Sequence, residues 1–269
     1  MANVVITGST KGLGKGLADA FARLGHNVVI TSRRQADIAT VTQEINKKSE
    51  GQIIGQVCDI SDKKQVEALW DLAKTEFGSV DYWINNAGYA SGQSPIHKIS
   101  ENLIHSMIDT NSLGTLFCSQ VAITGFRKQG SGRLYNMLGG SFDGKRIIKG
   151  MGVYSSTKAS INVLTKYLVA ENKNTNIIVG SISPGILITE NWLNEQQRLS
   201  PDAWKKIRPR INMLADQVET ATPWIVDQMI ENTKSGKRIA WLTPWKIIRR
   251  IIQAKLFGKK RDLFSRHGL

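Results

Sequence analysis

The amino-acid sequence predicts a doubly wound α/β fold, in which about seven parallel strands are covered by helices on both faces. Short apolar runs rich in β-branched residues alternate with longer helical patterns along the chain. Runs such as 28–30 and 177–179 are apolar at every position, as expected for strands buried on both sides of a parallel sheet. A glycine-rich turn between the first strand and the first helix is the third observation that favours this fold.

The predicted strands come in regular order along the chain. They lie at residues 4–7, 27–31, 52–58, 80–85, 133–137, 177–182 and 239–242. The helical patterns between them include 14–24, 63–77, 112–128, 154–172 and 224–232. No repeat or linker separates two halves, so residues 1–243 are expected to form one domain and residues 244–269 a C-terminal extension.

The composition excludes several classes of protein. With 41% hydrophobic residues, 24 glycines and 6 prolines in 269 residues, the chain is neither disordered nor collagen-like. Cys58 and Cys118 fit no metal-ligand spacing or disulfide framework, so we expect structural thiols in a reducing compartment. No signal peptide and no apolar run of ~18 residues is visible. These features predict a cytoplasmic protein, either free or peripheral at a membrane surface.

The positive charge is concentrated at the C-terminal end. Residues 234–269 contain 11 Lys or Arg and one acid, a net charge of +10, whereas the 233 residues before them carry 25 bases and 21 acids, a net charge of +4. A basic chain can bind nucleic acid, but here the charge lies in one amphipathic tail without a base-reading motif. We therefore expect no nucleic-acid partner.

The glycine-rich turn after the first strand predicts a phosphate-binding site. It consists of Gly8, Ser9, Thr10, Lys11, Gly12, Leu13 and Gly14. Its glycines allow a tight turn, and the free N–H groups and positive dipole at the start of the following helix stabilise a pyrophosphate. The alternative is an ordinary glycine-rich turn, but the strand before it and the helix after it favour a dinucleotide site of the Rossmann type.

Tyr154 and Lys158 are the first catalytic candidates. Their spacing of four residues places both side chains on one face of a helix. A tyrosine with a pKa near ~10 is a weak acid-base catalyst at neutral pH, but a neighbouring ammonium group favours the phenolate. We therefore expect Lys158 to lower the pKa of Tyr154 toward neutrality.

Taken together, these motifs resemble those of the short-chain dehydrogenase/reductase family over about 240 residues. Besides the Gly-x-x-x-Gly-x-Gly turn and the Tyr-x-x-x-Lys pair, the matching segments are Asp59-Ile60, Asn85-Asn86-Ala87-Gly88, Asn111 and Ser183-Pro184-Gly185-Ile186 with Thr189. The resemblance implies that Asp59, Ile60, Asn86, Ala87, Gly88, Pro184, Gly185, Ile186 and Thr189 contact a nicotinamide cofactor, as do Tyr154 and Lys158.

The resemblance also implies the reaction. Hydride passes from the nicotinamide to a carbonyl carbon while Tyr154 protonates the oxygen, Ser141 polarises the carbonyl, and Lys158 holds the ribose. Asn111 would anchor a water that relays protons to Lys158. Ser141 lies thirteen residues before Tyr154, as in much of the family, although it comes about two residues late after the strand 133–137. No metal is required, and the four histidines show no ligand spacing.

The end of the second predicted strand favours NADP(H) over NAD(H). It reads Ser32-Arg33-Arg34 without an acid, and Lys11 adds a further cation. A carboxylate at this place accepts the ribose 2′-OH of NAD, whereas arginine grips the 2′-phosphate of NADP through charge-assisted hydrogen bonds. The alternative is a pair of solvated surface arginines.

A finer resemblance concerns the substrate. The segments 136–141, 183–189 and 241–244 resemble the chlorophyll b reductase branch of the family, which reduces a formyl group on a chlorin ring with NADPH. We expect a substrate lid at about residues 187–215, where Trp192, Leu193, Leu199, Trp204 and Ile207 either contact a bulky apolar carbonyl substrate or pack between helices. Alternatives are a 3-oxoacyl thioester or steroid-type ketone reductase, or a non-catalytic NADP-binding scaffold. By the same resemblance, a homodimer or homotetramer is expected.

The C-terminal extension contains a basic amphipathic helix. Apolar residues at positions 248, 251, 252 and 256 share one face, and positions 246, 249, 250 and 253 lie opposite. Such a helix can lie on an anionic membrane surface. It can equally pack on the body of the protein, or on a second subunit, with its charges in water.

Overall fold

The central sheet has seven parallel strands in the order β3-β2-β1-β4-β5-β6-β9. The computed structural model describes residues 1–90, 92–196, 199–256 and 261–268. The strands are β1 (Asn3–Ile6), β2 (Asn27–Ser32), β3 (Ile53–Val57), β4 (Tyr82–Asn85), β5 (Ser131–Met137), β6 (Asn176–Ser183) and β9 (Arg238–Ala240). The predicted Rossmann-type fold is confirmed. The strand order reverses direction between β1 and β4, where such sheets bind their ligands.

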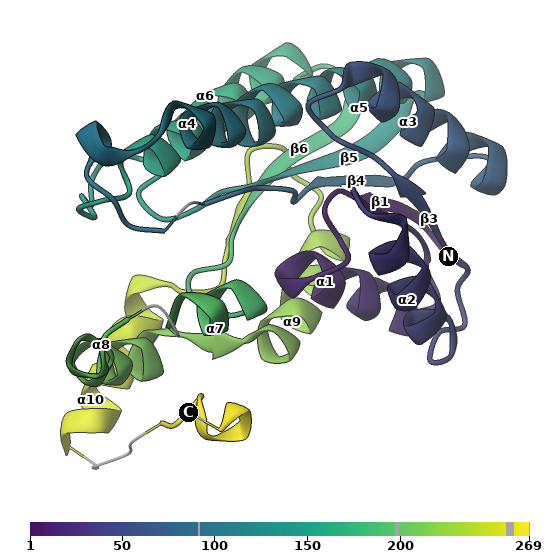
Figure 1. Cartoon of the computed structure of the whole chain (residues 1–269). Helices are drawn as coiled ribbons and strands as arrows, with labels where there is room; N and C mark the ends of the chain where they lie inside the picture. Colours follow the sequence, from purple (N-terminus) through teal and green to yellow (C-terminus); the bar gives the residue numbers. More distant parts are fainter. Residues whose placement is uncertain (91, 197–198, 257–260, 269) are drawn as a thin grey trace.

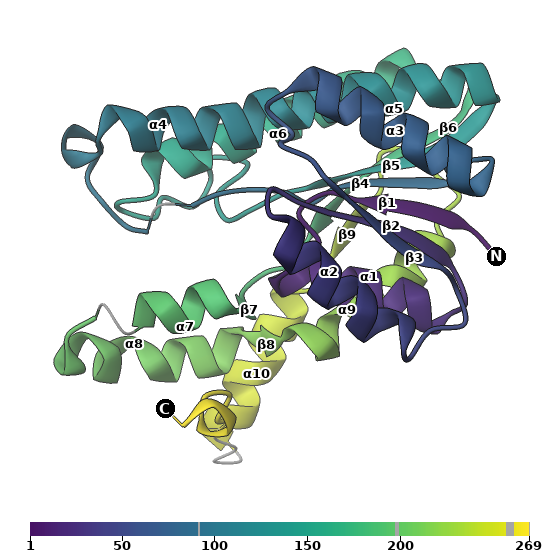
Figure 2. The same cartoon turned by 45° about the vertical axis from the view of Figure 1, so that its right-hand side comes forward.

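Helices cover both faces of the sheet, as Figures 1 and 2 show. One face carries α1 (Gly12–Arg23), α2 (Gln35–Asn46) and α9 (Val218–Ile230). The other face carries α3 (Lys63–Phe77), α5 (Thr115–Gln129) and α6 (Gly152–Glu171). α4 (Glu101–Met107) continues into α5 through a π-helical segment, Ile108–Gly114, and short 3₁₀ turns occupy Ile96–Lys98 and Ser265–His267.

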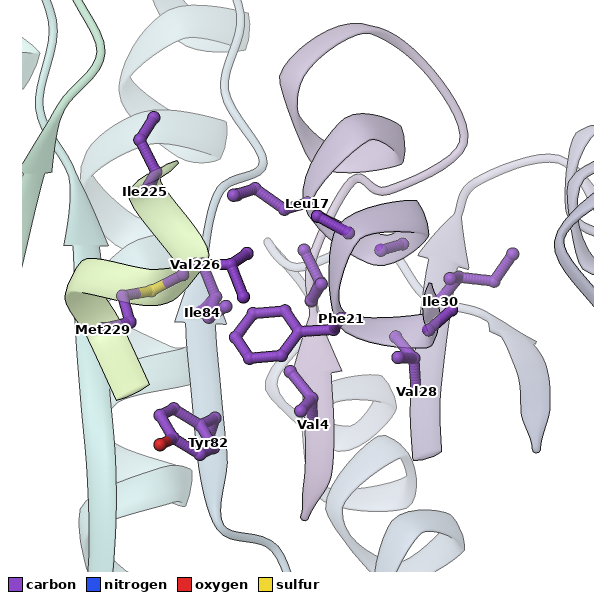
Figure 3. Close-up of a cluster of buried hydrophobic side chains, with 14 of the residues drawn as sticks. Val4, Leu17, Phe21, Val28, Ile30, Tyr82, Ile84, Ile225, Val226 and Met229 are labelled. Atoms are coloured by element: carbon purple, nitrogen blue, oxygen red, sulfur yellow. The ribbon is translucent and has the colours of Figure 1, made fainter. Parts of the chain in front are cut away.

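The two layers of the core follow from the alternation of side chains along each strand. In β1, Val4 and Ile6 face α1 and α9, whereas Val5 between them faces α3 and α5. Figure 3 shows the first layer, where the ring of Phe21 from α1 lies between β1 and the residues of α9. Trp83 of β4 is fully buried in the second layer.

A buried polar network joins the sheet to α6, the helix that carries Tyr154 and Lys158. Asn85 of β4 donates to the Oδ1 atom of Asn136 in β5 over 2.8 Å, and Asn136 donates to the Oγ1 atom of Thr165 over 2.9 Å. All three side chains are buried. Because these bonds lie in a low-dielectric interior and each removed partner would leave a buried polar group unpaired, they fix the placement of α6 on the sheet.

The expected lid and extension pack together beyond the carboxyl ends of the strands (Figures 1 and 2). They comprise β7 (Leu187–Ile188), α7 (Glu190–Gln196), α8 (Pro201–Leu214), β8 (Asp216–Gln217) and α10 (Pro244–Leu256). β7 and β8 pair as a small parallel sheet. Residues 197–198 of the expected lid, and 257–260 and 269 of the extension, lie outside the described residues.

The aromatic residues of this region form a third apolar cluster. Trp192, Leu193, Trp204 and Ile207 pack around buried Ile188, Ile211 and Phe264. The rings of Trp204 and Phe264 meet edge to face, with centroids 4.8 Å apart. These side chains therefore serve helix packing, which was one of the two interpretations of their sequence pattern. Among the described residues, no helix is long and apolar enough to span a bilayer.

Candidate functional site

The turn after β1 and the turn after β4 are joined directly. The backbone N–H groups of Asn86 and Ala87 donate to the Thr7 hydroxyl over 3.1 and 3.0 Å, and the Asn86 side chain donates to the carbonyls of Thr7 and Gly8. Gly8 adopts a φ of +61°, and a Cβ there would lie 2.9 Å from the Ala87 Cα. A side chain at residue 8 would therefore separate the two turns.

Gly14 allows α1 to start close to the sheet. A Cβ at this residue would lie 2.4 Å from both the Gly8 carbonyl oxygen and the Asn86 side-chain nitrogen. Ser9 and Thr10 are buried beneath the turn, and the Ser9 hydroxyl donates to the Ile6 carbonyl over 2.6 Å. These buried side chains anchor the turn to the sheet. No side chain caps the N-terminus of α1, so its first N–H groups are available to bind an anion.

A cleft of about 560 Å³ lies over this turn at the carboxyl ends of β1, β2, β3 and β4. Its lining includes thirteen residues predicted to bind the cofactor, namely Gly8, Lys11, Gly12, Leu13, Gly14, Ser32, Arg33, Asp59, Ile60, Asn86, Ala87, Gly88 and Thr189. Cys58, Tyr89, Ser106, Thr110 and Glu190 also line it and were not predicted. Tyr89, Cys58 and Glu190 directly adjoin the predicted residues Gly88, Asp59 and Thr189, which could have indicated them. Ser106 and Thr110 carry no such signal.

The two predicted phosphate-binding arginines differ in their surroundings. Arg34 forms a two-pronged ion pair with Asp37, through its Nε atom over 2.9 Å and its Nη2 atom, and this pairing raises the Arg34 pKa. Lys11 lies 3.8 Å from the same carboxylate. Arg33 is exposed, lines the cleft and forms no ion pair with a described residue. Arg33 is therefore the cation of this group that is free to meet an anionic ligand.

The Asp59-Ile60 pair forms the wall of the cleft after β3. The Asp59 Oδ1 atom accepts hydrogen bonds from the N–H and the hydroxyl of Ser61, over 3.0 and 2.6 Å, while Ile60 is buried against the core. The carboxylate is thus fixed by its own turn, and the adjacent aliphatic side chain supplies an apolar surface within the cleft. Such a pairing suits an aromatic base with polar edges.

Tyr154 and Lys158 lie on the first two turns of α6, against the end of β5. The Lys158 side chain is buried, and its Nζ atom donates to the Met137 carbonyl over 3.1 Å. This atom lies 5.8 Å from the centre of the Tyr154 ring. A Cβ placed on Gly88 would lie 3.4 Å from Lys158 Nζ, so Gly88 connects the cleft to this pair.

Burial controls the titration of both groups. It raises the pKa of Tyr154 to about 12, although part of the side chain stays accessible, and lowers the pKa of Lys158 to about 8. Burial is the cause that shifts the Tyr154 pKa in this structure, and the lowering of that pKa by Lys158 stays a prediction. At neutral pH the site holds a protonated phenol next to an ammonium group, which is the state needed to donate a proton.

Asn111 lies fully buried in the π-helical segment. Its Oδ1 atom accepts from the Tyr89 N–H over 2.7 Å, and its Nδ2 atom donates to the Tyr89 carbonyl and the Thr157 hydroxyl over 2.9 and 3.0 Å. These contacts tie the cleft loop to α6 one residue before Lys158. A π-helical turn is typical of functional sites because it redirects one side chain out of the helical ladder.

Ser141 is not joined to Tyr154 or Lys158 by a hydrogen bond among the described residues. It adopts a left-handed φ of 62°, rare for a residue other than glycine, and its hydroxyl donates to the Arg146 carbonyl. Gly139 instead lies against the catalytic candidates, since a Cβ there would lie 2.3 Å from the Tyr154 hydroxyl. Gly139 was not among the predicted site residues.

The segment after β6 joins the sheet to the expected lid. Gly185 has a φ of +73°, and a Cβ there would lie 2.5 Å from the Leu242 side chain. Pro184 and Ile186 flank this turn, and the Ile186 carbonyl accepts from the Asp216 N–H over 3.0 Å. Thr189 faces Gly12 across the cleft, within 3.3 Å of the position that a Gly12 Cβ would occupy.

The residues present fit a dinucleotide cofactor. Side chains at Gly8, Gly12 or Gly14 would push into the turns or toward Thr189, so the open cradle depends on glycine. The guanidinium of Arg33 lines the same cleft, and the buried Lys158 lies next to the inner end of the cleft. Within the described ranges, no three His, Cys, Asp or Glu side chains cluster as a metal site.

Comparison with known proteins agrees with this geometry. The family model for short chain dehydrogenases matches residues 2–199, and the chain belongs to this family of oxidoreductases, whose fold binds a nicotinamide cofactor. The chain is 34% identical over 272 residues to the chloroplastic chlorophyll(ide) b reductase NOL of Oryza sativa subsp. japonica, covering 97% of this chain and 77% of that protein.

Two further comparisons are informative. The diacetyl reductase [(S)-acetoin forming] of Staphylococcus epidermidis is 36% identical over 189 residues, covering 70% of this chain and 72% of that protein. The solved structure of ElxO with NADP bound superposes with a TM-score of 0.78 at 26% identity, covering 89% of this chain and 96% of that chain. The resemblance to chlorophyll b reductases is thus confirmed for nearly the whole chain.

Proposed function

We propose that this protein is an NADPH-dependent reductase that converts a carbonyl group on a bulky apolar substrate to an alcohol. The leading substrate class is a formyl-bearing chlorin, which would be reduced to the hydroxymethyl compound. The observation that carries the proposal is the Tyr154 phenol held beside the buried Lys158 ammonium at the inner end of the glycine-lined cleft.

The preference for NADPH rests on Arg33. Arg34 and Lys11 share the Asp37 carboxylate, whereas Arg33 lines the cleft without such a partner among the described residues. A guanidinium in this position can hold the 2′-phosphate with charge-assisted hydrogen bonds. The NADP bound to ElxO in its solved structure supports the same choice.

When bound in this cleft, the nicotinamide cofactor would supply the hydride needed to reduce the carbonyl carbon. The Tyr154 hydroxyl donates its proton to the oxygen as negative charge develops there. The ammonium of Lys158, fixed by Met137, stabilises the phenolate that remains and holds the ribose. Asn111 holds the loop at Tyr89 against α6 through its hydrogen bonds, and we assign it to the proton relay. Ser141 would turn its hydroxyl from the Arg146 carbonyl to the substrate oxygen.

Two observations support this substrate class: the share of the chain that each relative matches and the apolar residues of the lid. Chlorophyll(ide) b reductase NOL matches 97% of the chain, whereas the diacetyl reductase, named for a small diketone, matches 70%. We assign residues 187–215 to the lid, whose core of Trp192, Trp204 and Ile207 gives the site a rigid apolar boundary.

A homodimer or homotetramer fits the exposed apolar residues of α5, α6 and the segment before them. The side chains concerned are Ile108, Leu113, Leu116, Val163 and Tyr167. Several large exposed apolar side chains on neighbouring helices are typical of an interaction surface. A homo-oligomer that paired these helices would cover it.

The test is a substrate panel. Purified enzyme with NADPH or NADH is offered a formyl-chlorin, long-chain aldehydes, a 3-oxoacyl thioester and a steroid ketone, and oxidation of the cofactor is followed by absorbance. We expect the highest kcat/KM with NADPH and the formyl-chlorin, and loss of turnover in Tyr154→Phe. A preference for the thioester or steroid would overturn the substrate class. Tight NADPH binding without turnover of any carbonyl would indicate a scaffold.

A further inference from the structure

Five large apolar side chains of α10 point into solvent. Trp245, Ile248, Ile251, Ile252 and Leu256 are all exposed, Trp245 to 80% and Leu256 to 74%. Positions 245, 248, 252 and 256 follow the helical repeat and form one continuous stripe. A helix packed on a globular body normally turns this face inward, so the orientation of α10 requires a specific cause.

That cause is a buried acid on β8. Arg250, on the opposite side of α10, makes two hydrogen bonds to Asp216 over 2.8 and 2.6 Å, and Arg261 adds one over 2.6 Å. Lys246 lies 3.6 Å from Asp216 and 3.0 Å above the ring of Trp241. Arg250 and Asp216 are both buried.

The carboxyl group of Asp216 is ionised because of these contacts. Burial alone would raise its pKa, but the hydrogen bonds from Arg250, Trp241 and Arg261 outweigh this effect and lower it. Rotating α10 to bury its apolar stripe would carry Arg250 and Lys246 away from the buried Asp216 carboxylate, which would lose two of its three cationic partners, and this is unfavourable. The cationic side of α10 is therefore fixed against the body, and the apolar stripe is displayed.

The surroundings of the stripe are positively charged. Arg249 and Lys255 are exposed, and the helical repeat places them on its two flanks. The sequence from residue 234 to 269 carries a net charge of +10, whereas the single buried carboxylate of Asp216 is already matched by three cations. An occupant of this surface must therefore be both apolar and anionic.

We infer that the stripe of Trp245, Ile248, Ile252 and Leu256, with exposed Ile251 beside it, docks on an anionic lipid bilayer, with Arg249 and Lys255 meeting the headgroups. A lipid surface supplies both properties that the stripe requires, an acyl boundary for the apolar residues and negative headgroups for the flanking cations. A second copy of this chain would bring two tails of +10 together, so charge repulsion disfavours self-association through α10. An exposed tryptophan at the start of the helix suits the membrane interface.

The test uses full-length protein and vesicles of phosphatidylcholine, with or without phosphatidylglycerol. The protein is expected to co-sediment with the anionic vesicles and to be released by salt. Removing apolar area by Trp245→Ser with Ile252→Ser should lower binding by at least about tenfold, and Arg249→Glu with Lys255→Glu by a similar factor. Ile147→Ser removes an isoleucine outside α10 that is even more exposed than Ile252, and it should leave binding unchanged.

Three results would overturn the inference. The first is equal sedimentation with and without phosphatidylglycerol, and the second is unchanged binding by both double variants. The third is a change of oligomeric state in light scattering without a change in vesicle binding, which would assign the stripe to a second copy. Far-UV circular dichroism and cofactor binding verify that the variants are folded. This inference does not depend on the carbonyl substrate, because vesicle binding is measured without turnover.

Discussion

Replacing Arg33 by alanine should remove the preference for NADPH, whereas the same change at Arg34 should largely spare it. The two arginines are adjacent and both exposed, but Arg34 is held by Asp37 through two hydrogen bonds and Arg33 has no described acidic partner. Hydrogen bonds to a charged group contribute about 1.5–3 kcal/mol each. Loss of one such contact with the 2′-phosphate corresponds to roughly a 10- to 150-fold fall in kcat/KM for NADPH.

The assay compares kcat/KM for NADPH and NADH in the parent, Arg33→Ala and Arg34→Ala. The NADH value should stay within about twofold in Arg33→Ala, because that cofactor lacks the phosphate that the guanidinium binds. Thermal unfolding verifies that the surface change leaves the fold intact. If both variants kept the parent's ratio of NADPH to NADH, or if Arg34→Ala lost more of it than Arg33→Ala, the assignment of Arg33 would be wrong.

Two further substitutions and one pH profile test the roles of Gly139, Asp216 and Lys158. Gly139→Ala places a Cβ 2.3 Å from the Tyr154 hydroxyl and should cut kcat by about 100-fold with little loss of cofactor affinity, measured by steady-state kinetics and titration. Asp216→Ala leaves Arg250 buried without its partner and should lower the free energy of unfolding at neutral pH by about 3 kcal/mol in urea. Because the folded pKa of Asp216 is lowered, its contribution is present above the unfolded value of about 3.9 and lost as pH falls through the folded one, so parent and variant converge in acid. Because burial lowers the pKa of Lys158 to about 8, kcat/KM for NADPH should fall as pH rises through about 8, and a flat profile to pH 10 would remove Lys158 from cofactor binding.

The sheet was predictable because each strand carries its own local signal. Residues 28–30 and 177–179 are apolar at every position, and only a strand buried on both faces explains such a run. The glycine turn was predictable for a similar reason, since Gly8 and Gly14 are required by close backbone contacts that no other residue allows. α2 was not among the helices singled out, because its apolar positions are few and its caps lack side-chain hydrogen bonds.

The catalytic region was less accessible to sequence reasoning. The spacing of Tyr154 and Lys158 predicted that they share one face of a helix. It could not predict the burial that dominates their pKa values, because burial depends on how β5 and the cleft loop pack around them. The distance in sequence from Ser141 to Tyr154 did not show that the Ser141 hydroxyl bonds to Arg146. The loop after β5 determines this contact, and Gly139 acquires its role only when α6 packs against it.

The C-terminal helix shows the same limit. Its amphipathic pattern was correct, but the pattern left open whether the helix lies on a membrane or packs on the protein, and it placed the charges in water in the second case. In the structure, Lys246 and Arg250 point toward Asp216, more than 25 residues earlier in the chain. An ion pair between segments that are distant in the sequence produces no periodic pattern of residues. The pattern of one helix therefore could not predict that its cations face Asp216.

In the proposed function, Tyr154 and a nicotinamide cofactor bound in this cleft together reduce a carbonyl group. The most direct measurement offers the enzyme NADPH deuterated at the nicotinamide C4 together with the carbonyl compound that it turns over fastest, and analyses the alcohol by mass spectrometry. We predict one deuterium on the new carbinol carbon per turnover and a rate in Tyr154→Phe lower by about 100-fold or more. An alcohol without deuterium from either C4 epimer, or equal rates for the parent and Tyr154→Phe, would contradict the account.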